Sequence, residues 1–370
     1  KDNSSNLLAV RWAGNKEWVY LKNDAGEVLV RDQEKADSLN RFFDSISTID
    51  NGSLPELPHR VEPGIKLEEI EFSPQTLLKI GSKLKSKYSQ DPNGHSSFLL
   101  KQILPATTDI LAIMFSSFMT LGKIPDQWKS AVVSPLFKKG SSSNPANYRP
   151  VSLTSVFCKL MERVITEQML HYLIINKLIT KHQHGFLKGR CTATNLIETL
   201  NDWTVSFENK LGQSAVYIDF AKAFDSVSHP KLIYKLERYG IAGCLSPFIV
   251  DFLTGMSQCT RVGNCTSSFL PIMSGVVQGC CLGPVLFLLF INDLSDLFSG
   301  RVSIKMYADD IKLYTNLSMS DDPHTEFQTH LNLVAQWAKE WQLPIAHAKC
   351  CAMKIGRTNR IGCPLHLEDK

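Results

Sequence analysis

The sequence predicts an α+β protein, because helix-type and strand-type patterns occupy different parts of its 370 residues. Between residues 73 and 119 apolar side chains recur at the spacing of an amphipathic helix, and similar patterns cover 153–173 and 194–207. After residue 213, short β-type runs appear instead. Hydrophobic residues make up 44% and charged residues 21%, a folded composition that excludes a disordered regulator, a coiled coil and collagen.

The first 70 residues are predicted to be an extension and a linker. Asp32 can cap an amphipathic helix that carries Leu39 and Phe43 on one face. Residues 49–63 contain three prolines and a glycine, which is typical of a linker.

The cysteines and the apolar runs bear on the cellular compartment. None of the ten cysteines forms a Cys-x-x-Cys pattern, and two pairs are adjacent, which is poor geometry for disulfides or zinc. We therefore expect reduced thiols in an intracellular protein. The longest uninterrupted apolar run, 285–291, is too short to span a bilayer, so no membrane partner is expected.

Positive charge is concentrated in one segment of the chain. Residues 122–190 contain eleven Lys or Arg against three Asp or Glu, a local charge of +8. Because the whole chain carries +4, the remainder carries −4. This asymmetry indicates a contact face for nucleic acid or polyphosphate.

The sharpest chemical signal is a predicted hairpin with acidic residues at its tip. Residues 301–307 alternate between apolar and polar side chains, and 311–314 can return as a second strand. The tight turn between them presents Asp309 and Asp310. Adjacent carboxylates repel each other, and a divalent cation such as Mg²⁺, which prefers oxygen ligands, relieves that repulsion. A solvated acidic turn without function is the competing interpretation.

A third carboxylate favours the metal interpretation. Asp219 ends the apolar strand pattern 215–218, and an antiparallel neighbour could place it beside the Asp309–Asp310 turn. Three carboxylates at one sheet edge could hold a metal pair for in-line phosphoryl transfer.

Several segments, in order, resemble the motifs of reverse transcriptases. The segment Tyr307-Ala308-Asp309-Asp310 resembles the Y-x-D-D of motif C, and Asp219 opens a segment similar to motif A. The remaining matches are 137–140 with 147–153 and 183–190 for the fingers, 278–284 for motif B, and Trp337, Trp341 and Lys349 for motif D. Phrases at 217–220, 226–229 and 286–294 are similar to non-LTR, LINE-type retrotransposons of the jockey-like group.

The resemblance implies a right-hand polymerase fold with helical fingers and an antiparallel-sheet palm. The fingers would span 71–213 and the palm 214–356, after an N-terminal extension and linker at 1–70. The tail, 357–370, would stop before the thumb, so we expect the thumb to be missing.

The activity that the resemblance implies is that of an RNA-directed DNA polymerase, a nucleotidyltransferase. Its partners would be template RNA, a DNA primer or target site, and dNTPs. Its cofactors would be two Mg²⁺ ions, for which Mn²⁺ can substitute. A ribonucleoprotein in the nucleus and cytoplasm is the implied location, and the oligomeric state is left open.

The resemblance also carries residue roles. Asp219, Asp309 and Asp310 match the metal-binding catalytic carboxylates, and Lys349 matches a lysine proposed to protonate pyrophosphate. The expected substrate-binding residues are Phe220, Phe224, Gln278, Gly279, Arg149, Lys159 and Tyr307, and the expected nucleic-acid-binding residues are Lys138, Lys139, Lys188 and Arg190.

Two residues bear on the choice of sugar, and two other functions stay open. The ring of Phe224 would collide with a 2′-hydroxyl, and together with Ala308 it argues against an RNA-copying RNA polymerase. The other alternative is a catalytically incompetent fragment or domesticated descendant that only binds nucleic acid.

Overall fold

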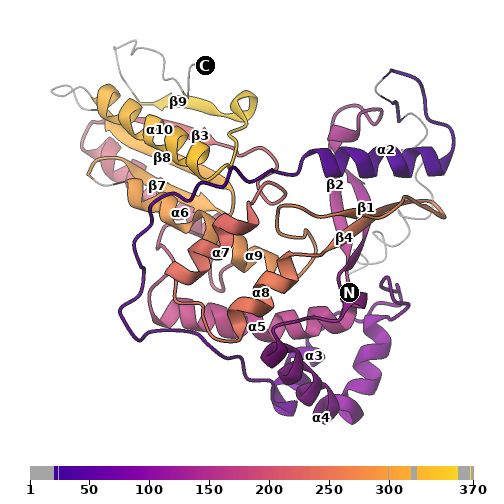
Figure 1. The fold of residues 1–370 in the computed structure, drawn as a ribbon. Coiled ribbons are helices and arrows are strands. Elements are labelled where there is room, and N and C mark those ends of the chain that lie inside the picture. The colour runs from indigo at the N-terminus through magenta and orange to yellow at the C-terminus, as the bar shows by residue number, and fades with distance from the viewer. Residues whose placement is uncertain (1–20, 24, 299, 318–322, 357–366, 368–370) are drawn as a thin grey trace, which may run out of the picture.

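The computed structural model describes residues 21–370 except 24, 299, 318–322, 357–366 and 368–370 (Figure 1). The described residues form both helices and largely antiparallel sheets, in agreement with the α+β prediction, although strands also occur in the first half of the chain. The described helices are α2 (Asp32–Ser45), α3 (Pro74–Ser82), α4 (Ser97–Leu121), α5 (Val156–Ile175), α6 (Thr192–Glu208), α7 (His229–Arg238), α8 (Leu245–Leu253), α9 (Gly283–Ile291) and α10 (Pro323–Glu340). The strands are β1 (Ser130–Phe137), β2 (Tyr148–Leu153), β3 (Gly212–Ile218), β4 (Ser257–Val262), β5 (Cys265–Thr266), β6 (Leu270–Pro271), β7 (Ser303–Tyr307), β8 (Asp310–Leu317) and β9 (Cys351–Ile355).

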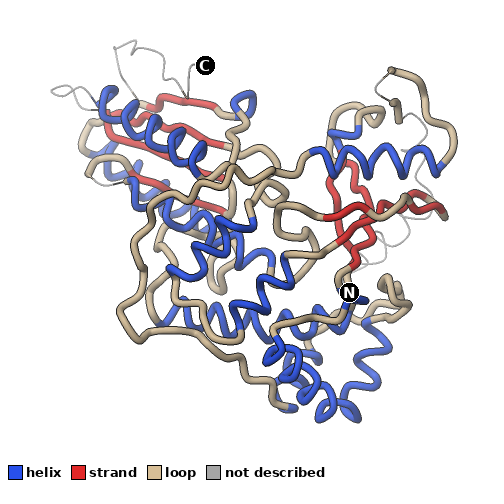
Figure 2. Tube along the Cα trace, in the orientation of Figure 1, coloured by secondary structure: helices blue, strands red, loops and turns tan. Residues whose placement is uncertain are grey.

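The strands form two separate sheets, which Figure 2 shows as two groups with helices between them. The first sheet has the order β2-β1-β4-β5, with β6 also paired to β4. The second has the order β7-β8-β3-β9 and is antiparallel throughout. Its β7–β8 hairpin and its strand β3 confirm the strand patterns in the second half of the sequence.

Helices cover both faces of the second sheet. Neighbouring residues of β8 face opposite ways, and their contacts show which helix lies on each side. Leu313 belongs to the large core that includes Phe327 and Val334 of α10. The neighbouring Tyr314 instead packs edge-on against Trp203 and donates a hydrogen bond to Asp202, both on α6. Strand β3 is accordingly buried at six of its seven positions.

The first sheet combines strands from segments that the sequence assigned to different domains. Strand β1 pairs in parallel with β4, so residues 257–271, predicted to lie in the palm, complete a sheet that begins in the predicted fingers. Helix α2, from the predicted extension, packs on the same sheet: Leu39 and Phe43 share a small core with Val133 and Val262. The predicted fingers therefore contain a sheet as well as helices, built from segments far apart in the sequence.

One described helix, α4, is long and apolar enough to cross a membrane by length and composition alone. Ser96 caps its first turn and Gly122, with φ +61°, ends it. One face of α4 contributes Leu104 and Phe115 to the large core, and α4 contacts α3, α5 and α8. Core helices of soluble proteins can have the same length and composition, so these two properties are weak support for a membrane span.

Candidate active site

The predicted carboxylates lie at one edge of the second sheet. Strand β3 ends at Ile218, which pairs with Ile311 of β8, so Asp219 follows directly opposite the start of β8. Asp310 is the first residue of β8, and Asp309 precedes it in the turn. The structure therefore brings the three residues to one edge of the sheet, as antiparallel pairing predicts.

The electrostatics of this edge are those of crowded anions. Partial burial raises the pKa of Asp309, and the charges of Asp310 and Asp219 raise it further. Partial burial and the charge of Asp219 also raise the pKa of Asp310. A divalent cation would remove this cost, and an oxygen-only donor set suits Mg²⁺. By the chemistry of their donor atoms, the three carboxylates fit the implied metal ions.

The carboxylates are not arranged around a common metal position. Among the described residues, no three His, Cys, Asp or Glu side chains are grouped so that they could hold a metal ion. Asp219 is instead bound to an ammonium group, with Lys349 Nζ 2.7 Å from Asp219 Oδ1. Both side chains are partly exposed, at 46% for Lys349 and 32% for Asp219, so the pair is open to exchange with solvent ions.

Basic side chains from three segments surround the carboxylates. Burial lowers the pKa of Lys138, and so do the neighbouring charges of Arg149, Lys349 and Lys139. The charges of Lys138 and Lys349 in turn oppose the rise in the pKa of Asp310. Lys138 follows β1, Arg149 lies in β2 and Lys349 precedes β9, so the structure brings four of the predicted basic residues to the carboxylate edge.

The other predicted basic residues lie elsewhere. Lys159, on α5, is an electrostatic neighbour of Glu162 and Cys281 rather than of the carboxylates. Arg190 donates hydrogen bonds to the carbonyl oxygens of Lys181 and Gln183, at 2.7 and 2.5 Å. Lys188 is placed on the same loop. The guanidinium of Arg190 thus stabilises its own loop, which the sequence did not indicate.

The Gln278–Gly279 segment is tied to the first sheet. Ser152, in β2, donates its backbone N–H to the carbonyl oxygen of Gln278 at 2.8 Å. Gly279 has φ +114°, and a Cβ at this position would lie 2.5 Å from the carbonyl oxygen of Ser152. The close backbone approach that requires glycine here is therefore to β2.

A family model described as reverse transcriptase (RNA-dependent DNA polymerase) matches residues 137–363, which is more than half of the chain. The chain belongs to the reverse transcriptase family. The segments that carry Asp219, Gln278 and the Asp309–Asp310 turn lie inside the matched range.

Curated relatives confirm the predicted jockey-like, non-LTR group. The RNA-directed DNA polymerase from the mobile element jockey of Drosophila melanogaster is 32% identical over 262 residues, covering 69% of this chain and 28% of that protein. The probable RNA-directed DNA polymerase from transposon BS of Drosophila melanogaster is 27% identical over 343 residues, covering 88% of this chain and 35% of that protein. The chain thus spans about a third of the length of these relatives.

A solved telomerase also resembles this reverse transcriptase. The structure, from Candida Tropicalis in complex with a fragment of telomeric RNA, is 9% identical and has a TM-score of 0.45. The match covers 67% of this chain and 45% of the telomerase chain, and the score is too low for an element-by-element comparison.

The aromatic residues of the predicted substrate site differ in their exposure. Phe224 is partly exposed; it stacks on Phe287 with ring centroids 4.3 Å apart and meets Phe186 edge-on. Tyr307 is partly exposed and pairs with Asp310 across the hairpin. Phe220, also predicted to bind substrate, is only 1% exposed. Its ring packs in the large core, with its centroid 6.2 Å from that of Trp337 on α10.

Gln183 braces the turn that carries Asp309 and Asp310, although sequence reasoning assigned it no role beyond a motif match. Its side-chain oxygen accepts hydrogen bonds from the backbone N–H groups of Gly185, at 2.7 Å, and Ala308, at 2.8 Å. Ala308 precedes the Asp pair and has φ +55°, a left-handed conformation that is uncommon for alanine. The buried amide of Gln183 therefore fixes the turn that carries motif C.

A buried carboxylate holds the other end of motif B. Glu162, on α5 and 1% exposed, accepts hydrogen bonds from the backbone N–H groups of Cys281, at 2.5 Å, and Leu282, at 3.0 Å. Cys281 and Leu282 directly precede helix α9, and an acceptor is favoured at a helix N-terminus. Burial raises the pKa of Glu162, and the two hydrogen bonds oppose the shift. Sequence patterns could not have indicated this residue, because its periodicity on α5 is that of a core position.

Proposed function

We propose that this chain is the fingers and palm of an RNA-directed DNA polymerase that adds dNTPs to the 3′-end of a DNA primer on an RNA template. The observation that carries the proposal is the carboxylate edge: Asp219, Asp309 and Asp310 meet beside the cations Lys138, Arg149 and Lys349. The family membership and the names of the relatives support it.

The proposed chemistry assigns the carboxylates to metal binding. Asp219, Asp309 and Asp310 would hold two Mg²⁺ ions, or Mn²⁺ in their place. Bound there, the metals would supply Lewis acidity for in-line displacement at the α-phosphate. Asp219 would exchange its ion pair with Lys349 for metal binding.

The basic residues would act on the phosphates and on the leaving group. Arg149 and Lys138, which are electrostatic neighbours beside Asp219, would bind the triphosphate of the incoming dNTP, and arginine can do so in a bidentate manner. Lys349 Nζ, released from Asp219, would donate a proton to the departing pyrophosphate. Lys139 and Lys188 would contact the nucleic-acid backbone.

Partly exposed side chains would define the nucleotide pocket. The ring of Phe224, fixed by its stack on Phe287, would exclude a 2′-hydroxyl and favour dNTPs over rNTPs. Tyr307 and the Gln278–Gly279 segment would contact the nascent base pair. We propose a nuclear and cytoplasmic ribonucleoprotein as the setting, from the mobile-element relatives alone.

One observation favours a second candidate function. The Lys349–Asp219 ion pair occupies a carboxylate that catalysis needs, while the basic cluster around it suits nucleic acid. The second candidate is therefore a protein that binds nucleic acid without extending a primer.

Primer extension separates the two functions. The purified chain, with Mg²⁺, dTTP and oligo(dT) on poly(rA), should extend the primer. Asp309→Asn should lower the rate by roughly a hundredfold or more, since it removes a charge from a clamp that contributes several kcal/mol. The matched control, Asp109→Asn on the exposed face of α4, should keep the parent's rate.

Two results would contradict the polymerase proposal. A folded parent that binds the primer–template but does not extend it would establish the second candidate. An Asp309→Asn chain with the parent's rate and melting temperature would remove the metal role of the turn.

A further inference from the structure

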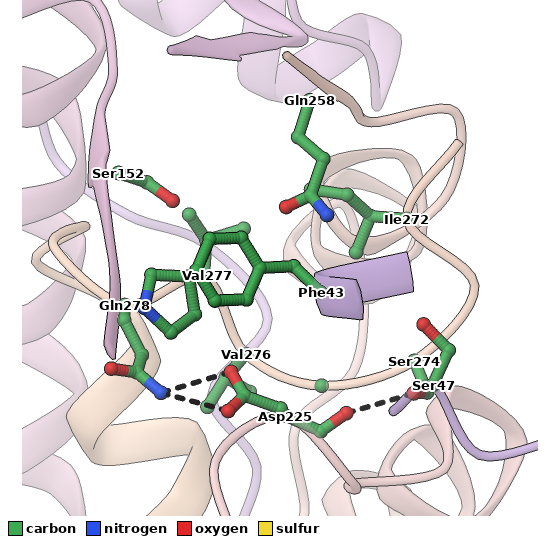
Figure 3. A pocket seen from close by; sticks show the side chains of 12 residues that line it. Phe43, Ser47, Ser152, Asp225, Gln258, Ile272, Ser274, Val276, Val277 and Gln278 are labelled. Carbon is green, nitrogen blue, oxygen red and sulfur yellow. Dashed lines mark hydrogen bonds between the residues drawn. The ribbon is translucent and has the colours of Figure 1, made fainter. Parts of the chain in front are cut away.

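Behind Gln278 lies a small cavity of about 30 Å³, whose lining Figure 3 shows. Its floor holds Asp225, six positions after Asp219 in the motif A segment. Both carboxylate oxygens of Asp225 accept hydrogen bonds from Gln278 Nε2, at 2.9 and 3.0 Å. Figure 3 shows both of these hydrogen bonds.

Both partners are held in place by their backbones. The backbone oxygen of Asp225 accepts a hydrogen bond from Ser274 Oγ at 2.8 Å, and its N–H donates to Lys222 O at 2.8 Å. The carbonyl oxygen of Gln278 is bonded to Ser152 of β2. The geometry of the pair is therefore set by the fold and not by side-chain rotation alone.

A carboxylate can only accept hydrogen bonds, so Asp225 decides which way the Gln278 amide faces. The NH₂ group must turn toward Asp225, and the oxygen then points to the opposite side, as it does in Figure 3. Within the described part of the chain, Gln278 Oε1 accepts no hydrogen bond. Gln278 is only partly buried, so this oxygen is available to a ligand as an acceptor.

The segment that carries Gln278 connects the parts of the proposed nucleotide site. Val276 donates its N–H to the carbonyl oxygen of Phe224 at 2.8 Å, and Gln278 is bonded to the strand that carries Arg149. Backbone hydrogen bonds thus connect the segment that carries Gln278 to the residue proposed to select the sugar and to the strand of the proposed phosphate-binding arginine.

The chemistry of the nascent base pair indicates which donor meets this acceptor. A polymerase must copy every sequence, whereas a base edge in the minor groove offers a donor only at guanine. Sugar hydroxyls are donors that do not depend on sequence, and an RNA template has one on every residue. A fixed acceptor at this position therefore suits a sugar hydroxyl.

We propose that Asp225 is a positioning residue that makes Gln278 a one-way acceptor for a sugar hydroxyl at the nascent base pair. The hydroxyl is the 2′-hydroxyl of the template or the 3′-hydroxyl of the incoming nucleotide. The inference rests on the proposed polymerase function. It adds a role for Asp225 that is exerted through Gln278.

The test begins with Asp225→Asn, whose side chain offers a donor as well as an acceptor and lets the Gln278 amide face either way. For dTTP on poly(rA), kcat/KM should fall about tenfold, mainly through KM, because one oriented hydrogen bond is lost. Gln278→Glu, which sets two carboxylates against each other, should lose at least as much. Asp109→Asn is the control and should match the parent.

The exchanged pair, Asp225→Asn with Gln278→Glu, provides the rescue. In this double variant the new asparagine can donate to the new glutamate, whose second oxygen is again a fixed acceptor, and the net charge of the pair is unchanged. We expect kcat/KM to return to within about threefold of the parent. A double variant as poor as the product of the two single losses would overturn the inference. Where a single variant does not fold, a folded double variant that stays about tenfold or more below the parent would overturn it instead.

Two substrate changes identify the hydroxyl. If the Asp225→Asn loss disappears on a DNA template, the donor is the template 2′-hydroxyl. If it disappears with ddTTP, the donor is the 3′-hydroxyl of the nucleotide. An equal loss on all substrates would assign Asp225 a purely structural role and overturn the inference. A parent without extension activity would overturn the proposed function and this inference together, whereas an active parent with these contrary results overturns the inference alone.

Discussion

Two regions of the proposed site are held in place in different ways. One is the turn that carries Asp309 and Asp310, and the other is the loop that carries Gln278. The turn is the tip of one continuous hairpin, in which β7 and β8 pair directly. The loop is held by residues distant in sequence: Ser152 bonds it on one side and Glu162, 119 residues from Cys281, on the other. The difference shows that local sequence can shape the acidic turn, while the loop that carries Gln278 depends on the assembled fold.

The comparison predicts that the loop is the more fragile region, and Gly279→Ala is the strongest test. The substitution combines a positive φ with a Cβ placed 2.5 Å from a backbone oxygen that β2 holds in place. We expect roughly 3 kcal/mol or more of lost unfolding free energy, measured by urea denaturation.

Gly94→Ala is the matched control for that experiment. Gly94 also has a positive φ, +81°, but a Cβ there meets nothing within 4 Å. Its substitution should cost only about 1 kcal/mol, the strain of the backbone alone. Equal losses at the two positions would mean that the contact with β2 adds nothing, and the contrast between the regions would be lost.

The buried carboxylate below the loop predicts a dependence of stability on pH. Burial raises the pKa of Asp225 from 3.8 to about 6, and the Gln278 hydrogen bonds and Lys222 oppose the shift. Between these pKa values the folded state binds the proton more tightly than the unfolded state, so the contribution of Asp225 to stability falls as pH rises. The fall should total about 3 kcal/mol and end above about pH 6.

An asparagine side chain does not titrate, so Asp225→Asn isolates this effect from the other acidic groups. The unfolding free energy of the variant minus that of the parent should rise between about pH 4 and about pH 6 and then stay level. Asp309→Asn should show the same sign, since the pKa of Asp309 is also raised. A difference for Asp225→Asn that stays constant over this range would show that its carboxyl is not destabilised by burial.

Gln183 tests whether the hairpin tip is as independent as its pairing indicates. Gln183→Met removes the acceptor for Ala308 N–H and should lower primer extension by roughly tenfold, through about 1–3 kcal/mol of lost positioning. Gln183→Glu keeps the acceptor and should retain more activity than Gln183→Met. Gln336→Met, at an exposed position of α10, is the control. Unchanged extension by Gln183→Met would establish that the turn holds its form alone.

The same contrast explains how far the sequence could be interpreted. Alternation along 301–307 and an apolar run ending at Asp219 were enough to predict the hairpin, strand β3 and the meeting of three carboxylates, because period and pairing are local signals. The parallel pairing of β1 with β4 left no such signal, so residues 257–271 were assigned to the palm.

Buried polar residues were the other gap. Gln183, Glu162 and Asp225 act through backbone groups or side chains more than fifty residues away, and no spacing rule connects them to their partners. Phe220 shows the converse, because its motif position suggested a substrate contact while its exposure of only 1% places it in the core. The predicted boundaries between extension, fingers and palm stay a prediction, because each hydrophobic core contains residues from more than one of these segments.

The smallest expected effect concerns the basic rim, by which we mean Lys138, Lys139 and Arg149 beside the carboxylates. Packing does not decide what these exposed charges contribute to nucleic-acid binding. Lys138 and Lys139 are exposed beside Arg149, so their double substitution to Gln should weaken binding to an RNA–DNA primer–template of any sequence by a few-fold. Released counterions drive such contacts, so the slope of log Kd against log salt should become shallower by roughly one unit per lost phosphate contact. Fluorescence anisotropy between about 50 and about 200 mM salt measures both quantities.

Lys79→Gln with Lys87→Gln, exposed near α3 and far from the hairpin in Figure 1, removes the same charge and should change the slope little. Equal changes from the two pairs would mean that net charge alone sets affinity, and the rim would lose its place in the site.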